Sequence, residues 1–348
     1  MNEKKFLQFL ESVDDAYLLE TERALTRKKA KLGLGRKAAS LIAAVLVLTL
    51  TVSATYVATH WDERFLKIFK PSEAVMEQTA AGVQNLSVMS QCGDTTLYVE
   101  QSLGDETTIY FMLDVMLPDT VSAAEYAVPN ENGDGYIPTI MPWDLHVYDC
   151  PASYADVCGM TMDETVSLLE KHGAEYCGSI GVQTECVDLQ TNTLSYLVEV
   201  GMNDEQVDAR LKTLTLAFAG LGDYTSNEMI LEGPFLISWN VENHGDVYHY
   251  DIYEGNRQVG KIMLSGFSLQ VSLESSTYTE CDALMDDVRI VYRDGKKEAP
   301  DGTCSGSIIL PEGRVKLEWR FHEIQVMDQI ESVEIAGYTC KTALKNPK

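Results

Sequence analysis

The sequence is poor in basic residues for its length. Its 348 residues include 27 Lys and Arg against 53 Asp and Glu, which gives a formal net charge of −26. Nucleic-acid binding needs clustered positive charge to neutralise phosphates, so this composition excludes a broad nucleic-acid-binding surface. A hydrophobic content of 45% also excludes a wholly disordered chain. The length fits two domains with additional segments.

The sequence also lacks the motifs of common active sites. It contains no GxSxG nucleophile elbow, no HExxH motif, no Walker loop and no GxGxxG. Its eight cysteines form no CxxC pair and have no zinc-ligand spacing to a histidine. Residues 130–135 begin like a calcium loop, but Met141 stands where a bidentate glutamate is needed, which favours a surface turn. We therefore predict a protein that is not an enzyme and holds no metal or cofactor.

No charged residue occurs in residues 38–58. A helix of this length spans roughly 30 Å, the thickness of the hydrocarbon core of a bilayer. Residues 1–37 hold nine basic and six acidic residues. Those closest to the apolar run are Arg27, Lys28, Lys29, Lys31, Arg36 and Lys37. By the positive-inside rule we predict a single transmembrane helix at residues 38–59, a cytoplasmic N-terminus and an extracellular remainder.

Two other interpretations of the apolar run are a buried core helix and a cleaved signal peptide. A core helix normally carries a polar stripe. A signal peptide has an apolar region of roughly 7–15 residues and a shorter basic region before it. Both comparisons favour an uncleaved anchor in the cell membrane. Trp61, just beyond the run, is expected at the membrane interface.

The predicted cytoplasmic tail, residues 1–37, carries a short apolar stripe. Phe6, Leu7, Leu10 and Val13 have helical spacing. A segment of this size cannot bury enough surface to fold alone, so the stripe is expected to bind a cytoplasmic protein or the membrane surface. The alternative is a partly disordered tail, whose basic residues set the topology and contact anionic lipid headgroups.

The rest of the chain alternates apolar and polar residues with a period of two. Such segments lie within residues 97–103, 109–117, 143–147, 194–200, 214–218, 235–241, 267–273, 288–292, 315–321 and 333–335. Alternation at short intervals is typical of antiparallel sheets with one buried and one solvated face. We predict a juxtamembrane linker at residues 60–80 and two Ig-like β-sandwich domains at residues 81–243 and 244–348. The fold class is therefore mainly β, with one transmembrane α-helix and a short helical tail.

Two further features of the exterior can be read from the residues. Thr161 and Glu164 form a capping box that predicts a helix, and Gly173 provides its left-handed end. Trp143, Trp239 and Trp319 are expected in the sandwich cores. All eight cysteines follow the apolar run, where an oxidising environment permits disulfides. The alternative is that they are reduced and buried as small apolar residues.

Two stretches resemble a known family. Residues 65–73 (FLKIFKPSE) and 99–115 (VEQSLGDETTIYFMLDV) are similar to segments of single-span, anti-sigma-factor-like membrane proteins of Gram-positive bacteria. The resemblance implies a membrane-proximal β-rich extracellular domain of unknown function, often followed by a second β-domain. It also implies a negative effector of an extracytoplasmic-function sigma factor. The tail departs from zinc-containing sigma-binding domains, because no Cys or His precedes residue 60.

Two functions from different classes remain open. The first is a single-pass membrane regulator, in which the exterior senses a condition or an unknown extracellular ligand and the tail holds a sigma factor or another cytoplasmic protein. The second is a membrane-anchored surface module that binds a wall component, a small molecule or a protein and has no cytoplasmic role. Deleting residues 2–22 distinguishes them, because only the first predicts altered transcription.

Overall fold

The computed structural model describes residues 61–130, 132–133, 135–174, 178–202, 213–243, 245–274, 284–309, 313–335 and 337–341. Residues 58–348 form one compact unit, to which all of the described residues belong. The predicted tail and the predicted membrane helix, with all their candidate partner-binding and topogenic residues, lie outside the described residues. None of the described helices is both long enough and apolar enough to span a bilayer.

The described chain begins with a segment that contains two short helices. We call residues 61–78 the proximal segment. Helix α3 (Glu63–Phe69) begins after Asp62, whose side chain accepts a hydrogen bond from the Arg64 amide, and ends at Lys70 in the left-handed conformation. Pro71 follows, and Ser72 caps α4 (Glu73–Gln78). A 3-10 turn, η1 (Ala80–Gly82), leads into the first strand.

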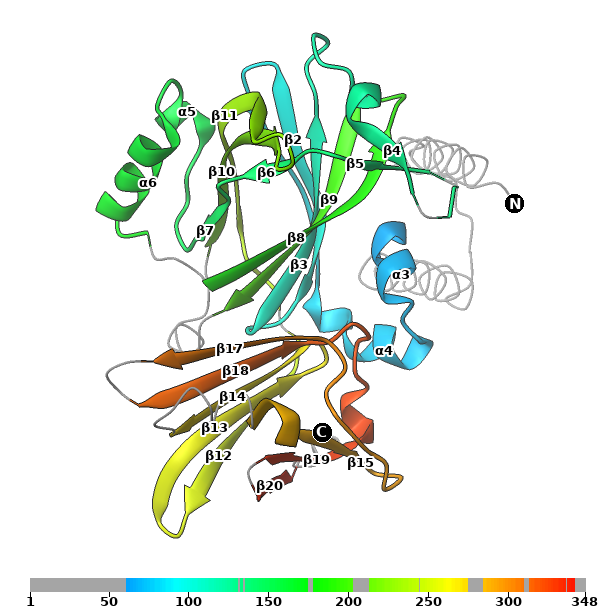
Figure 1. Cartoon of the computed structure of the whole chain (residues 1–348), viewed down its shortest axis with the longest axis vertical. Coiled ribbons are helices and arrows are strands. Elements are labelled where there is room, and N and C mark those ends of the chain that lie inside the picture. The colour runs from blue at the N-terminus through cyan, green and yellow to red at the C-terminus, as the bar shows by residue number, and fades with distance from the viewer. Residues whose placement is uncertain are drawn as a thin grey trace, which may run out of the picture. The chain divides into compact units, whose positions relative to one another are not determined.

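The strands that follow form an N-terminal β-region, β1 to β11 (Figure 1). Its larger sheet has the order β1 (Val83–Cys92), β2 (Thr95–Gly104), β3 (Thr108–Met116), β9 (Thr193–Met202) and β8 (Gly178–Asp188). A second sheet contains β11 (Glu228–Asn240), β10 (Thr213–Asp223), β6 (Met141–Trp143) and β7 (His146–Tyr148). A small ladder joins β4 (Ala127–Pro129) to β5 (Tyr136–Pro138), after η2 (Ala123–Tyr126). All the pairings are antiparallel, as the alternating sequence predicts.

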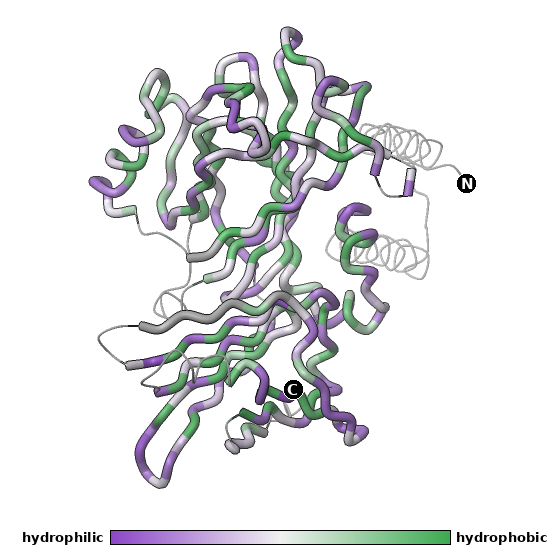
Figure 2. Tube along the Cα trace, in the orientation of Figure 1, coloured by the Kyte–Doolittle hydropathy of each residue, from purple (hydrophilic) through white to green (hydrophobic). Residues whose placement is uncertain are grey.

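Strand β3 is buried on both faces. Ile109 and Phe111 lie in the core between the two sheets, whereas Tyr110 and Met112 alternate with them and lie in a different apolar cluster. Successive side chains of a strand point to opposite faces, so the second cluster covers the outer face of the larger sheet. Hydrophobic residues follow the central strands in Figure 2. The expectation of one solvated face therefore fails at β3, because other parts of the chain cover it.

Two helices connect β7 to β8. They are α5 (Tyr154–Val157) and α6 (Met162–Lys171). The predicted capping box at α6 is confirmed, because the Glu164 amide donates to the Thr161 hydroxyl and the Glu164 carboxylate accepts from the Thr161 amide at 2.9 Å. Gly173 follows with a φ of +84°, the left-handed conformation that the sequence predicts.

The remaining strands form a C-terminal β-region, β12 to β20. Its larger sheet has the order β12 (Val247–Glu254), β13 (Arg257–Ser265), β14 (Ser268–Glu274), β18 (Arg314–Arg320) and β17 (Thr303–Ile309). The other sheet has the order β16 (Lys297–Glu298), β15 (Arg289–Tyr292), β19 (Ile330–Ile335) and β20 (Tyr338–Lys341), with η3 (Met327–Gln329) before β19. An apolar core of its own lies within this region and includes Ile262, Leu317 and Ile330.

Of the four tryptophan positions predicted from the sequence, two are confirmed and two are wrong. Trp239 and Trp319 lie in the cores of the two β-regions, as expected. The prediction for Trp61 is wrong, because this residue is 1% exposed and packs inside the protein rather than at a membrane interface. The prediction for Trp143 is also wrong, since its partly exposed ring stacks on Tyr224 with the centroids 4.5 Å apart.

Several thiols carry no disulfide. Among the described cysteines these are Cys92, Cys150, Cys158, Cys186 and Cys340. Cys92 is buried in the core of the N-terminal β-region, and burial raises its thiol pKa. At this position the cysteine acts as a small apolar residue.

Candidate functional site

The candidate site is the place where the proximal segment attaches to the two β-regions. Trp61, Phe65 and Phe69 recur every four residues, so they share one face of the segment, and they are 1%, 0% and 7% exposed. Their aromatic rings contact one another and Tyr110 of β3, and the Phe69 and Tyr110 centroids lie 5.0 Å apart in an edge-to-face arrangement. The same cluster includes Leu103, Met112 and Leu197 of the larger N-terminal sheet.

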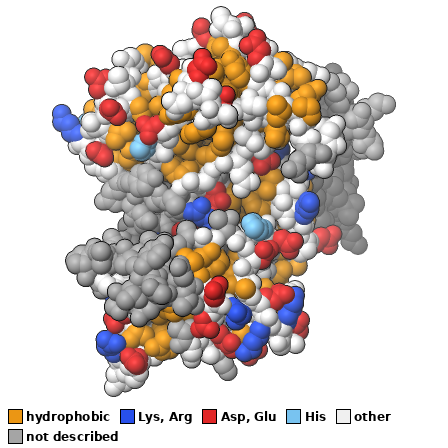
Figure 3. Space-filling model, viewed as in Figure 1, with side chains coloured by type: hydrophobic (Ala, Val, Ile, Leu, Met, Phe, Trp, Pro, Cys, Tyr) orange, Lys and Arg blue, Asp and Glu red, His pale blue; other side chains and the backbone are white. Residues whose placement is uncertain are grey.

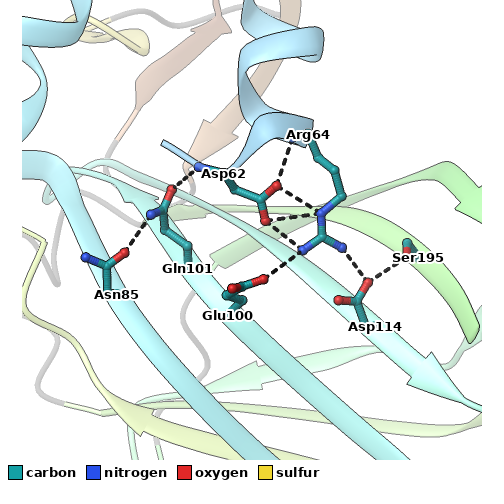
Figure 4. Close-up of polar contacts among 7 residues, drawn as sticks. All are labelled: Asp62, Arg64, Asn85, Glu100, Gln101, Asp114 and Ser195. Carbon is teal, nitrogen blue, oxygen red and sulfur yellow. Dashed lines mark hydrogen bonds and ion pairs between the residues drawn. The ribbon is translucent and has the colours of Figure 1, made fainter. Parts of the chain in front are cut away.

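Arg64 makes the polar part of this attachment (Figure 4). Its Nη2 donates to Asp62 Oδ2 at 2.6 Å, and its Nε lies 3.1 Å from both Asp62 carboxylate oxygens. Its Nη1 donates to Asp114 Oδ1 of β3 at 2.6 Å. A looser ion pair of 3.8 Å joins Nη2 to Glu100 of β2. One guanidinium therefore binds its own helix cap and two strands of the sheet.

Further hydrogen bonds hold the carboxylates and the start of the segment. Ser195 of β9 donates its hydroxyl to Asp114 Oδ1 at 2.6 Å. The Asp62 amide donates to Gln101 Oε1 at 2.8 Å, and the Gln101 amide group in turn donates to Asn85 Oδ1 at 2.7 Å. Four strands of one sheet, β1, β2, β3 and β9, thus contribute to the polar attachment.

The electrostatics of the site favour the charged state of both central residues. Burial alone would raise the pKa of Asp62, but the hydrogen bonds and charge of Arg64 hold it below its ordinary value. Burial works against the charge of Arg64, yet Asp62 and Asp114 raise its pKa above its ordinary value. The side chains of Arg64, Asp62 and Asp114 are 22%, 9% and 15% exposed, so solvent screens this network only in part.

The proximal segment also binds the C-terminal β-region. Gln78 of α4 accepts a hydrogen bond from the Met327 amide at 2.8 Å and donates to the Gln325 carbonyl at 3.3 Å. Phe267 and Ile324 belong to the same apolar cluster as Trp61. One cluster is therefore shared by the proximal segment and by both β-regions.

The described contacts of the site attach the proximal segment to the sheet. Arg64 pairs with Asp62 and Asp114, and the Ser195 hydroxyl donates to the same Asp114 oxygen that Arg64 binds. Over the described part of the chain, no group of three or more His, Cys, Asp or Glu could hold a metal ion. What the geometry provides is a fixed connection between residue 61 and two β-regions.

The sequence patterns did not predict this attachment, although they drew attention to Trp61 and to residues 65–73 and 99–115 for other reasons. The partner-binding residues predicted from the sequence, Phe6, Leu7, Leu10 and Val13, lie outside the described residues, so the structure does not bring them to the site. Two signals could have identified the attachment. One is the four-residue spacing of Trp61, Phe65 and Phe69, and the other is the nearly unbroken apolar run of β3.

Comparisons with known proteins give no family. No family model and no curated protein matches this chain. One similar solved structure is described as the crystal structure of the conserved domain protein from Bacillus anthracis. It shares 9% sequence identity, with coverage of 72% of this chain and 75% of that chain and a TM-score of 0.37. Likeness at this level carries no argument about function.

Proposed function

We propose that the protein is a single-pass membrane regulator with extracellular β-domains. In this proposal residues 38–59 span the membrane and residues 1–37 lie in the cytoplasm. The regulator acts as an anti-sigma-factor-like negative effector of an extracytoplasmic-function sigma factor. The proposal rests on the charge pattern of the sequence and on the family resemblance of residues 65–73 and 99–115.

The observation that supports a regulator most directly is the attachment of the proximal segment. Trp61 is already buried in the β-rich body, only two residues after the proposed end of the span. Arg64 and Gln78 fix the segment to both β-regions. A movement between those regions would therefore reach the outer end of the span without being absorbed by a flexible linker. A module that needed only an anchor would not need this connection.

The proposed exterior consists of two Ig-like β-sandwich domains. Antiparallel sheets with an apolar core in each β-region are consistent with this architecture. On the cytoplasmic side, Phe6, Leu7, Leu10 and Val13 form the face that binds the sigma factor or another cytoplasmic protein. Because one helix transmits little by itself, the signal would require proteolysis, oligomerisation or exchange of the partner.

The test uses the full-length protein in its own membrane. We expect deletion of residues 2–22 and the single change Leu10→Glu to release the partner and to raise transcription from its promoters. Gln8→Glu, two residues away on the polar side of the stripe, is the matched control. Transcript sequencing and affinity capture followed by mass spectrometry provide the two measurements, with immunoblotting to confirm equal amounts of protein. Unchanged transcription in both variants, with no captured sigma factor, would instead support the membrane-anchored surface module.

A further inference from the structure

The contact between the two β-regions, which we call the seam, contains buried charge. It joins the β2–β3 turn and β9 of the N-terminal β-region to strands β12, β13, β14 and β18 of the C-terminal β-region. The Thr107 and Ser268 hydroxyls lie 2.7 Å apart across it, and Gln270 Nε2 donates to the Met202 carbonyl at 3.3 Å. At the exposed rim, His249 Nε2 lies 2.6 Å from Glu106 Oε1.

Asp105, in the β2–β3 turn, is the most enclosed carboxylate of the seam at 2% exposed. Its Oδ1 accepts hydrogen bonds from the Thr107 amide at 2.7 Å, the Thr107 hydroxyl at 2.6 Å and the Thr108 amide at 3.0 Å. Its Oδ2 is buried and has no hydrogen-bond partner among the described residues. Gly245 closes the site, because a Cβ there would lie 2.7 Å from Asp105 Cβ.

A second carboxylate crosses the seam. Glu199 of β9 pairs with Arg320 of β18 at 2.7 Å, and Arg320 Nε also lies 3.2 Å from Glu318. These three side chains are 13%, 14% and 9% exposed. Together with Asp105, three largely buried carboxylates share the seam with one guanidinium. Full ionisation therefore leaves two uncompensated negative charges in a region that water enters poorly.

Protons remove this imbalance. A proton on Asp105 Oδ2 cancels one charge and turns a buried acceptor without a donor into a donor. Gln270 Oε1 is another buried acceptor of the seam that has no donor among the described residues. A buried carboxylate oxygen without a donor is more costly when it is ionised, so the unpartnered Oδ2 favours the protonated form of Asp105.

We propose that the seam is a proton-linked joint: it takes up protons on Asp105 and Glu199 as the two β-regions close on each other, and it loosens as the pH rises. This proposal goes beyond the proposed function and holds whether or not the protein spans a membrane.

Other charged or titratable groups also face the seam. The experiment must distinguish their effect on the pH dependence from that of Asp105 and Glu199. These other groups are Glu106 in the β2–β3 turn, Tyr110 on β3, Asp246 before β12, His249 on β12, Glu318 and Arg320 on β18, His322 after β18, and Asp301, which pairs with His322.

The direction of the pH dependence follows from the pKa shifts of the two carboxylates. Burial raises the pKa of Asp105 despite the hydrogen bonds from Thr107 and Thr108 and the nearby Ser265 hydroxyl. Burial also raises the pKa of Glu199, although Arg320 opposes the shift. In the opened seam both groups return to ordinary values near 4. Opening therefore becomes easier as the pH rises from about 4 toward the raised values, by up to about tenfold per pH unit for each proton.

The experiment measures hydrogen exchange by mass spectrometry on the full-length chain at several pH values from 4.5 to 8. Rates are corrected for the pH dependence of intrinsic exchange. We expect protection of peptides covering residues 104–108 and 265–270 to fall at least about tenfold over this range, while α6 stays constant. Asp105→Asn keeps the shape of the side chain without its charge. It should remove the part of the pH dependence that Asp105 causes, so that protection falls less over this range than in the unmodified chain, and the remaining fall belongs to Glu199.

Two further variants keep the test decisive. Glu199→Gln should weaken the pH dependence independently, which covers the case in which Asp105→Asn fails to fold. His249→Gln is the matched control at the rim of the same seam and should leave the dependence intact. Seam protection that does not change with pH, or a dependence that disappears in His249→Gln and is undiminished in both carboxylate variants, would overturn the proposal.

Discussion

At the scale of single residues, Arg64 illustrates how one side chain can define an attachment. Its guanidinium presents several N–H donors in a fixed plane, which lets it bind Asp62 on its own helix and Asp114 on β3 at the same time. Lysine could not reproduce this geometry, because its single ammonium group is a point charge. The partial burial of the network makes the loss of one partner more costly than it would be on an open surface.

Replacing Arg64 should destabilise the protein and weaken the hold on the proximal segment. In Arg64→Met, Asp62 and Asp114 lose their shared counter-charge, and we expect the free energy of unfolding to fall by about 1–3 kcal/mol. Lys67→Met, on the exposed side of the same helix, should change it by less than about 0.5 kcal/mol. Urea unfolding followed by tryptophan fluorescence measures both. Equal effects of the two variants would contradict the role assigned to Arg64.

At the scale of elements, helix α3 depends on its surroundings. A helix of seven residues is unstable by itself, because it gains too few hydrogen bonds to offset nucleation. The Asp62 cap and the left-handed end at Lys70 define its limits. The face formed by Trp61, Phe65 and Phe69 provides the packing that stabilises it.

Removing the central side chain of that face should release the helix. Phe65 is 0% exposed, so Phe65→Ala leaves a cavity between α3 and the sheet, and we expect a loss of about 3–5 kcal/mol. Limited proteolysis should then cut within residues 61–78 before it cuts the strands. Lys67→Ala is the control in the same helix and should leave the cleavage pattern as in the unmodified protein. Cleavage elsewhere first would argue that α3 is held by something other than this face.

At the scale of the whole molecule, acidic groups have two opposite effects on stability. Acidic side chains are spread over the face shown in Figure 3, in keeping with the net charge of −26. Asp62 has a lowered pKa, so its contribution to stability is present above its ordinary value near 4 and is lost as the pH falls below it. Asp105 and Glu199 have raised pKa values, so they reduce stability as the pH rises above about 4.

The stability of the full chain should therefore pass through a maximum in mildly acidic solution. As the pH increases from about 2, we expect the urea concentration at the unfolding midpoint to rise, to reach its maximum between about pH 4 and 5, and then to fall toward neutral pH. Asp62→Asn should lower the midpoint at neutral pH and flatten the acidic side of the profile, leaving the slope of the neutral side unchanged. Unfolding midpoints measured at half-unit pH intervals test both sides separately. An acidic side that Asp62→Asn does not alter would show that the Asp62–Arg64 pair is not its cause.

The sequence alone determined the local features of this protein. A period of two identifies β2, β3, β9, β10, β14 and β18, because a strand with a buried face needs an apolar residue at every second position. The Thr161 capping box predicts the start of α6 correctly, because its two hydrogen bonds join residues only three positions apart. The predicted span and tail also follow from local charge and hydropathy, and they remain predictions.

Only the tertiary structure decided which faces meet. Arg64 binds Asp114, which is 50 residues away in the sequence, and Gln78 binds Met327, which is 249 residues away. Such pairs leave no periodic signal, since any acidic residue in a sequence with 53 of them is a possible partner for a given arginine. The outer cover of β3, the attachment of the proximal segment and the buried carboxylates of the seam all depend on this long-range packing, which the folding of the whole chain specifies.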